Sequence, residues 1–311
     1  MATPIIVDGT MDRVAIAPRV FLPEPGVFSD RAARFAQLAP GHAMADYLLL
    51  MSAVAAAQSA ALTRRSAPPV AAVDLDRSRE YGMPPLSALG HARDPQWRDD
   101  LRDITQHVVR VSTAAAVLGA IKTLATVDDK SLEALADRVL GASTRDDDAV
   151  FVPFVGAALQ VYFTRLAVTL TAADLERFDV PTVCPVCATR PVASVVRLGG
   201  ARSNLRYLAC ALCATEWNLA RIQCTACEEH KGVHYLTLQA EGDDAARGPF
   251  AARKAEACDE CKSYLKIFYQ EKDPLVEPVA DDLASLALDL LVDEQGFGRS
   301  GPNLLLHPGG G

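Results

Sequence analysis

Cysteine is absent from most of this chain, since all eight cysteines among its 311 residues lie between positions 184 and 261. An excess of positive charge is absent too. The formal net charge is −8, which argues against a general binder of nucleic acid or of membrane surfaces. No long apolar run is free of polar residues. The best membrane-span candidates, 43–62 and 150–170, contain Asp46 and Arg165 respectively, so we expect buried helices there.

The familiar marks of catalysis and of export are also missing. The sequence holds no Gly-rich phosphate loop, no G-x-S-x-G elbow and no H-E-x-x-H helix, so we expect no enzyme. The opening stretch "MATPIIVDGTMDRVA" reaches Asp8 and Asp12 before any apolar run, which predicts a cytoplasmic protein without a signal peptide. In that reducing compartment, paired cysteines are more often metal ligands or redox groups than disulfides.

Residues 1–180 are predicted to form an α-helical domain. The stretch "DRAARFAQLA" is expected to be a helix capped by Ser29 and ended by Pro40. A second helix, "SLEALADRVLG", is expected to be capped by Ser131 and ended by Gly141. The stretch "VFVPFVGAALQVYFTRLAVTL" is apolar on most sides, which predicts a buried central helix. Another apolar stripe recurs at steps of three and four residues: Tyr47, Leu50, Val54, Ala57 and Ala61.

Residues 181–272 are predicted to form a β domain in which one plan occurs twice. In each copy two strands form a hairpin between two cysteine pairs, and a third strand follows. The first copy consists of "VASVVRL" (192–198), "LRYLAC" (205–210) and "EWNLARI" (216–222). The second copy consists of "HYLTLQA" (234–240), "ARKAEAC" (252–258) and "YLKIFYQ" (264–270).

Residues 273–311 are predicted to hold one C-terminal helix and an irregular tail. In "DDLASLALDLLVDEQG", Asp281 and Asp282 would lie at the positive N-terminus of the helix. Three leucines would then share the inward face: Leu283, Leu286 and Leu290. Clustered carboxylates elsewhere, as in "RDDDAV", are expected to be solvated surface.

The cysteines form four C-x-x-C pairs: Cys184 with Cys187, Cys210 with Cys213, Cys224 with Cys227, and Cys258 with Cys261. Two such turns can complete a tetrahedral shell of four thiolates. Either hairpin fits between neighbouring pairs, so sequential pairing predicts two metal sites, 184/187/210/213 and 224/227/258/261. Crossed pairing stays open. A thioredoxin-like redox role is disfavoured because the strands are short and joined by hairpins. Zinc and a rubredoxin-like iron both suit four sulfurs.

The residues next to the cysteine pairs leave the exact geometry and ligand set of the sites open. No glycine follows the second cysteine of any pair, so the turns are expected to be less regular than usual. His230 and His234 follow Cys227 and could replace a thiolate or lie next to the ligands, although exposed or strand-borne positions are the default expectation.

The alternative function is a ribbon-type nucleic-acid-binding protein. Residues 181–272 carry a net charge of +2, with 12 Lys and Arg against 10 Asp and Glu. The arginines near Tyr207 and Trp217 could form a basic face, or they could offset the negative charge of the thiolates. These arginines are Arg197, Arg202, Arg206 and Arg221.

Several stretches also carry a resemblance to a known family. They are "CPVCATRPVASVVR", "LRYLACALCATEWNLARIQCTAC" and "CDECKSYLKIFYQEKDP", followed by "DDLASLALDLL" and "GFGRSGPNLLL". Together they resemble the FdhE family, the accessory proteins of formate dehydrogenase. The likeness is specific over about the last 130 residues. The helical first half is compatible with it but less diagnostic.

The resemblance implies a cytoplasmic, non-catalytic maturation factor with a helical domain and a tandem rubredoxin-like or zinc-ribbon domain. Its partner would be the immature catalytic subunit of formate dehydrogenase, bound before export. A membrane span and a nucleic-acid partner are not expected, and a homodimer is left open. The resemblance implies two metal ions per chain, with iron as the proposed metal. The ligands would be Cys184, Cys187, Cys210, Cys213, Cys224, Cys227, Cys258 and Cys261. No short motif carries over a partner-binding surface.

Overall fold

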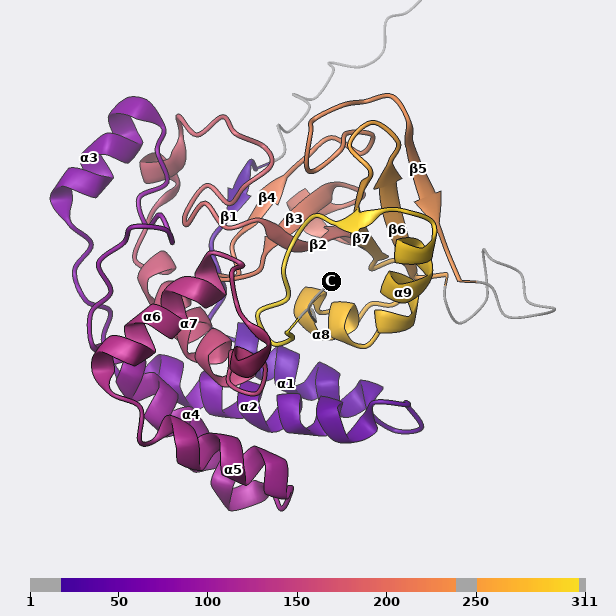
Figure 1. Cartoon of the computed structure of the whole chain (residues 1–311). Coiled ribbons are helices and arrows are strands. Elements are labelled where there is room, and N and C mark those ends of the chain that lie inside the picture. Colours follow the sequence, from indigo (N-terminus) through magenta and orange to yellow (C-terminus); the bar gives the residue numbers. More distant parts are fainter. Residues whose placement is uncertain (1–17, 239–250, 308–311) are drawn as a thin grey trace, which may run out of the picture.

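The computed structural model describes residues 18–238 and 251–307, and a group of helices packs there beside a single β-sheet (Figure 1). The helices are α1 Val27–Leu38, α2 Ala45–Arg64, α3 Ala72–Tyr81, α4 Gln96–Val111, α5 Ala115–Leu124, α6 Asp129–Leu140, α7 Val152–Ala167, α8 Pro278–Leu283 and α9 Leu286–Glu294. The strands are β1 Val20–Phe21, β2 Pro191–Val196, β3 Arg206–Cys210, β4 Glu216–Asn218, β5 Val233–Leu236, β6 Arg253–Cys258, β7 Ser263–Tyr269 and β8 Gly298–Arg299. The predicted α+β class, with helices first and a cysteine-bearing sheet second, is confirmed.

Helix α7 is the centre of the helical part, as its apolar sequence predicted. All of its 16 residues are buried, and α2, α4 and α6 pack against it. At Gly156 an added Cβ atom would lie 2.1 Å from the carbonyl oxygen of Leu304. Glycine is therefore required there, because the C-terminal segment crosses α7 in direct contact with its backbone.

Helix α2 is the one described helix whose length and composition would suffice to cross a membrane. Core helices of other proteins meet the same criterion, and α2 packs against α1, α4 and α7. Val54, Ala57 and Ala61 are buried on its predicted stripe, while Tyr47 and Leu50 are partly buried. The expectation of a packed helix is confirmed.

Two predicted helix caps are wrong. Helix α1 begins after Gly26, and the hydroxyl of Ser29 donates to the Gly26 carbonyl at 2.7 Å instead of accepting a cap bond. Helix α6 is capped by Asp128, whose carboxylate accepts from the Ser131 backbone N–H at 3.0 Å. Asp128 is the N-cap because it directly precedes the first turn of the helix, whereas Ser131 already lies inside that turn.

The two predicted hairpins belong to one continuous sheet. Its strand order is β1-β4-β3-β2-β7-β6-β5, and β8 pairs with β7. Strands β2 and β7 pair in parallel and join the copies, while the pairs within each copy are antiparallel. Strand β1 adds residues from the helical part to this sheet. The third strand ends at Asn218 rather than at position 222, and positions 239–240 of the predicted fourth strand lie outside the described residues.

The predicted C-terminal helix is two helices. Helix α8 ends at Leu283 and α9 starts at Leu286, so Leu288 and Val292 point inward and Leu290 is 69% exposed. The expected shared face of Leu283 and Leu290 is wrong. The Nζ of Lys266 donates to the carbonyl oxygens of Asp282 and Ser285, which satisfies the main chain where the helix breaks.

Helix α8 connects the helices to the sheet through buried ion pairs. Glu277 accepts from Arg31 at 2.9 Å and Asp281 from Arg34 at 2.8 Å, while Asp282 accepts from Arg299 at 2.6 Å. Asp281 and Asp282 are completely buried, and Asp148 of "RDDDAV" is buried against Arg138. The expectation of solvated surface for "RDDDAV" holds for Asp146 and Asp147, which are exposed, and is wrong for Asp148. The buried carboxylates Asp148, Asp281 and Asp282 are tolerated because each has an arginine partner.

Candidate metal centre

The structure brings the eight cysteines together as two groups of four. Cys184, Cys187, Cys210 and Cys213 form the first centre, and Cys224, Cys227, Cys258 and Cys261 form the second. Within each centre the Sγ atoms all lie within 4.8 Å of one another. The pairing along the chain is therefore sequential, as the repeated hairpin plan predicted, and the crossed alternative is excluded by this geometry.

The spacing of the sulfur atoms fits a metal ion better than a disulfide. In the first centre the Sγ atoms of Cys187 and Cys210 are 3.4 Å apart, and in the second those of Cys227 and Cys258 are 3.7 Å apart. A disulfide needs about 2.05 Å. A tetrahedron with metal–sulfur bonds of about 2.3 Å has sulfur–sulfur edges of about 3.8 Å. Each centre can therefore hold one tetrahedral ion.

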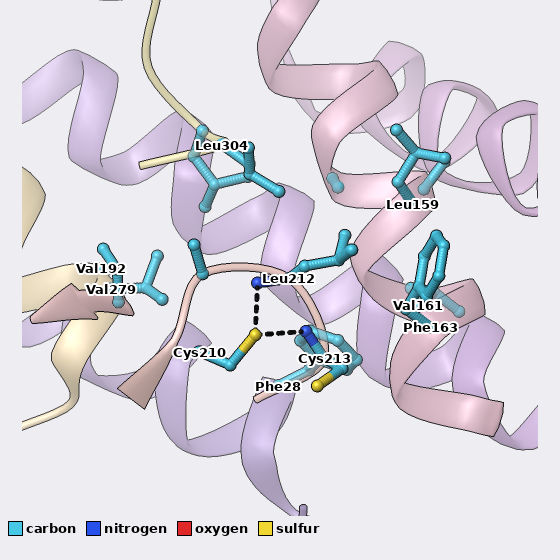
Figure 2. Packing of buried hydrophobic residues seen from close by; sticks show 14 of the residues in the cluster. Phe28, Leu159, Val161, Phe163, Val192, Cys210, Leu212, Cys213, Val279 and Leu304 are labelled. Atoms are coloured by element: carbon cyan, nitrogen blue, oxygen red, sulfur yellow. Dashed lines mark hydrogen bonds between the residues drawn. The ribbon is translucent and has the colours of Figure 1, made fainter. Parts of the chain in front are cut away.

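The turns that carry the cysteines are regular, contrary to the expectation from their missing glycines. The residue after the second cysteine has a positive φ in every pair: 61° at Ala188, 57° at Ala214, 65° at Glu228 and 53° at Lys262. Backbone N–H groups of Leu212 and Cys213 donate to the Cys210 sulfur at 3.3 and 3.4 Å (Figure 2). The turn geometry is therefore retained, although a residue with a Cβ atom is strained in this conformation.

The helical part holds the turns of the first centre in place. The backbone N–H groups of Leu86 and Ala88 donate to the carbonyls of Val186 and Cys187, both at 2.9 Å. From α7, the Gln160 side chain donates to the Ala211 carbonyl at 2.8 Å. The neighbouring Leu212 lies beside α7 in the same apolar cluster (Figure 2). The first centre is thus part of the main core.

Burial also affects the chemistry of the first centre. All four cysteines are buried, and burial raises the pKa of the Cys184 and Cys210 thiols. Four thiolates in such a place repel one another and lack water, so a cation is the partner that would stabilise them.

The second centre is more open. Cys224 and Cys258 are buried, whereas Cys227 and Cys261 are exposed. Burial opposes ionisation of Cys261, but hydrogen bonding to Ser263 and to neighbouring thiols lowers its pKa to about 7. The Sγ of Cys261 lies 2.9 Å from the Ser263 hydroxyl oxygen. This centre therefore combines the same ligand set with direct access from solvent.

The two histidines near the second centre stay outside its group of sulfur atoms. The Nδ1 atom of His230 lies 2.7 Å from the Ile222 carbonyl oxygen, and the ring of His234 lies against Phe297 and 3.4 Å from Asp259. The default expectation for both residues is confirmed, because neither replaces a thiolate.

The arginines near Tyr207 and Trp217 are occupied by internal contacts. Arg197 and Arg202 pair with Glu216, and Arg221 donates to the Asn204 carbonyl. The two aromatic rings themselves are buried. These residues therefore form no exposed basic and aromatic stripe, which was the mark expected of a nucleic-acid face.

One connection between the two copies was missed in the sequence. Arg206 on β3 reaches Glu256 on β6, with Nη2 2.6 Å from the carboxylate, and both side chains are buried. The same guanidinium donates to the carbonyls of Ala220 and Gln223, next to Cys224. The periodicity of apolar residues does not reveal a buried ion pair of this kind. The feature of the sequence that could have indicated it is a charged residue within an otherwise apolar strand.

Comparisons with known proteins find the same family along nearly the whole chain. Three family models match: "FdhE, N-terminal" over residues 17–179, "FdhE, central domain" over 183–221 and "FdhE, C-terminal domain" over 222–306. The first centre falls in the central model and the second in the C-terminal one. The junction between these two models lies just before Cys224.

Curated relatives and a solved structure cover nearly the full length. The "Protein FdhE homolog" of Pseudomonas aeruginosa is 39% identical over 100% of both chains. The "Protein FdhE" of Salmonella arizonae is 36% identical over 95% of this chain and 93% of its own. The crystal structure of the FdhE protein from Pseudomonas aeruginosa matches with a TM-score of 0.81 and 37% identity, over 94% of this chain and 100% of that chain.

Proposed function

This chain belongs to the FdhE family, and from that premise we propose that it is an accessory protein of formate dehydrogenase. In this proposal it binds the immature catalytic subunit in the cytoplasm and supports its maturation, without catalysing a reaction itself. The resemblance of the cysteine-bearing stretches supports the formate dehydrogenase assignment.

The proposal includes two metal ions per chain, one in each centre. The four sulfurs of each centre would be the ligands, and iron or zinc would complete a closed tetrahedral shell. A closed shell leaves no open position for substrate, so the ions would stabilise the fold or respond to oxidation. Metal analysis and visible absorption after anaerobic purification distinguish a coloured ferric tetrathiolate site from colourless zinc.

The observation that carries the proposal is the way the first centre is built into the molecule. Its turns bond to α7 and to the segment around Leu86, and its strands continue into the sheet that carries the second centre. Metal binding would therefore fix the relative position of the helical part and the sheet. A rigid surface of this kind suits recognition of an incompletely folded partner.

The direct test is co-purification. The tagged, metal-replete chain is co-expressed with the catalytic subunit of formate dehydrogenase, and with an unrelated exported metalloenzyme as the control. We expect retention of the catalytic subunit alone, together with reduced formate oxidation in cells that lack the chain. If both centres are filled and the catalytic subunit is not retained, the proposed function is wrong.

A further inference from the structure

A cavity of about 700 Å³ lies where α1, the first half of the sheet and the β7–α8 connection meet. A second cavity of about 450 Å³ adjoins it. The two share four lining residues: Phe21, Arg197, Arg202 and Gln270. We call the continuous depression the junction groove. Because the two cavities share these residues, an extended chain can pass from one into the other.

One turn of the first centre contributes to the lining of the junction groove. Cys210 and Ala214, which belong to this turn, line the larger cavity. The walls come from the helical part and from residues 274–279 before and within α8. The groove therefore exists only where the helical part, the first centre and α8 are held together.

The arginines of the junction groove are already neutralised. Arg31 pairs with Glu277, and Arg34 with Asp273 and Asp281. Arg197 and Arg202 share Glu216, and Arg202 also pairs with Glu24. The Arg202 guanidinium lies 3.9 Å from the centre of the Phe21 ring. Positive charge in the groove is thus consumed by internal partners.

Two exposed carboxylates line the groove, Glu24 and Asp30. Asp30 is exposed on α1 and has no ion-pair partner within residues 18–238 and 251–307. The side chain of Glu24 is 74% exposed, and its Oε1 atom accepts from Arg202 at 2.9 Å. Both carboxylates can therefore accept hydrogen bonds from a basic side chain at little cost in desolvation.

Apolar side chains lie open beside these carboxylates. Leu275 is 61% exposed on the rim, and Leu198, which lines the smaller cavity, is 50% exposed. Leu22 and Val27, which also line the larger cavity, are only partly buried. A ligand that covers them must carry apolar groups as well as positive charge.

We propose that the junction groove binds an extended segment of the partner protein in which basic and apolar side chains occur together. This inference rests on the proposed function, since it names the part of the molecule that receives the catalytic subunit. Basic side chains of the segment bind Glu24 and Asp30, and its apolar side chains cover Leu198 and Leu275. Loss of the first metal ion releases the turn that holds Cys210 and Ala214, and the groove loses part of its lining and its affinity.

The first experiment needs no catalytic subunit. A fluorescent peptide of about eight alternating leucine and arginine residues, about 26 Å long when extended, is titrated with the full-length, metal-replete chain. Its partner probe has glutamate in place of arginine. Two groove variants are compared with the wild type, Leu275→Ser and the double variant Glu24→Gln/Asp30→Asn. The matched controls on α9 are Leu290→Ser and Asp293→Asn/Glu294→Gln, which change equally exposed side chains.

We expect the basic peptide to bind, the acidic one to bind at least about tenfold more weakly, and each groove variant to lose about tenfold in affinity while the controls keep theirs. Equal binding of both peptides, or equal losses in the α9 controls, overturns the groove assignment.

A second readout separates this inference from the proposed function. A photo-crosslinking residue at position 275 should capture the catalytic subunit through a Lys- or Arg-containing peptide, whereas one at position 290 should not. If the wild type retains the catalytic subunit and the crosslink forms only at 290, the groove is wrong and the proposed function stands. If the peptide result holds but the subunit is never retained, the groove stands and the proposed partner is wrong.

Discussion

At the scale of single residues, Arg206 is the side chain whose role changed most between sequence and structure. It was considered for a basic face, yet its side chain is buried and lies between the two halves of the sheet. Burial raises the pKa of Glu256, and the Arg206 guanidinium opposes that rise. Each charge is therefore tolerated in the interior because the other one is present.

We predict that Arg206→Ala lowers the free energy of unfolding by about 3–5 kcal/mol, since it leaves a buried carboxylate without a partner. Replacing both residues, as Arg206→Met/Glu256→Leu, should recover most of this loss. Arg221→Ala is the matched control because Arg221 is exposed, and its cost should stay within about 0.5 kcal/mol. Urea denaturation of metal-replete protein measures all three. A loss for Arg206→Ala no larger than for Arg221→Ala would contradict this account.

At the scale of elements, the two centres differ in what surrounds their turns. The first centre is tied to the helical part, because Gln160 of α7 bonds to the Ala211 carbonyl between Cys210 and Cys213. Loss of a ligand such as Cys210 should therefore affect the helices as well as the first half of the sheet. The exposed Cys261 has no comparable contact with the helical part among the described residues.

We therefore predict that two equivalent cysteine substitutions destabilise different parts of the molecule. Cys210→Ser should release one ion and increase amide hydrogen exchange in α7, since that helix shares its core with the turn. Cys261→Ser should also release one ion, but with faster exchange confined to 224–236 and 258–266. Hydrogen exchange with mass spectrometry, together with metal analysis, checks both variants. Unchanged protection of α7 in Cys210→Ser would mean that the first centre stabilises the sheet alone.

The same scale explains what could be predicted from the sequence. Spacing and repetition of the cysteine pairs were sufficient for the hairpins and for the sequential grouping, because a C-x-x-C turn is a local structure. The parallel contact of β2 with β7 was not predictable, since it joins segments far apart in the chain and leaves no local pattern. The break before α9 was missed for a related reason. It depends on Lys266, a residue of another element.

At the scale of the whole molecule, the chain carries one buried centre and one open centre in a single sheet. In the first, Cys210 lines the junction groove but is only 2% exposed, and the other three cysteines are fully buried, so a chelator reaches these ligands only after the surrounding structure opens. The second offers Cys227 and Cys261 directly to solvent. Access therefore differs between the centres even though their ligand sets are the same.

This asymmetry predicts that metal leaves in two steps. During incubation with excess chelator, one ion per chain should be lost quickly from the second centre, and the other only at the rate of sub-global opening. Metal analysis of desalted samples over time would resolve the two phases. In Cys261→Ser the fast phase should be missing, while the slow phase keeps its rate. Because a turn of the first centre lines part of the junction groove, the affinity of the groove for the basic peptide should follow the slow phase. Loss of both ions in one phase would mean that the centres open together, and that exposure of two ligands does not control release.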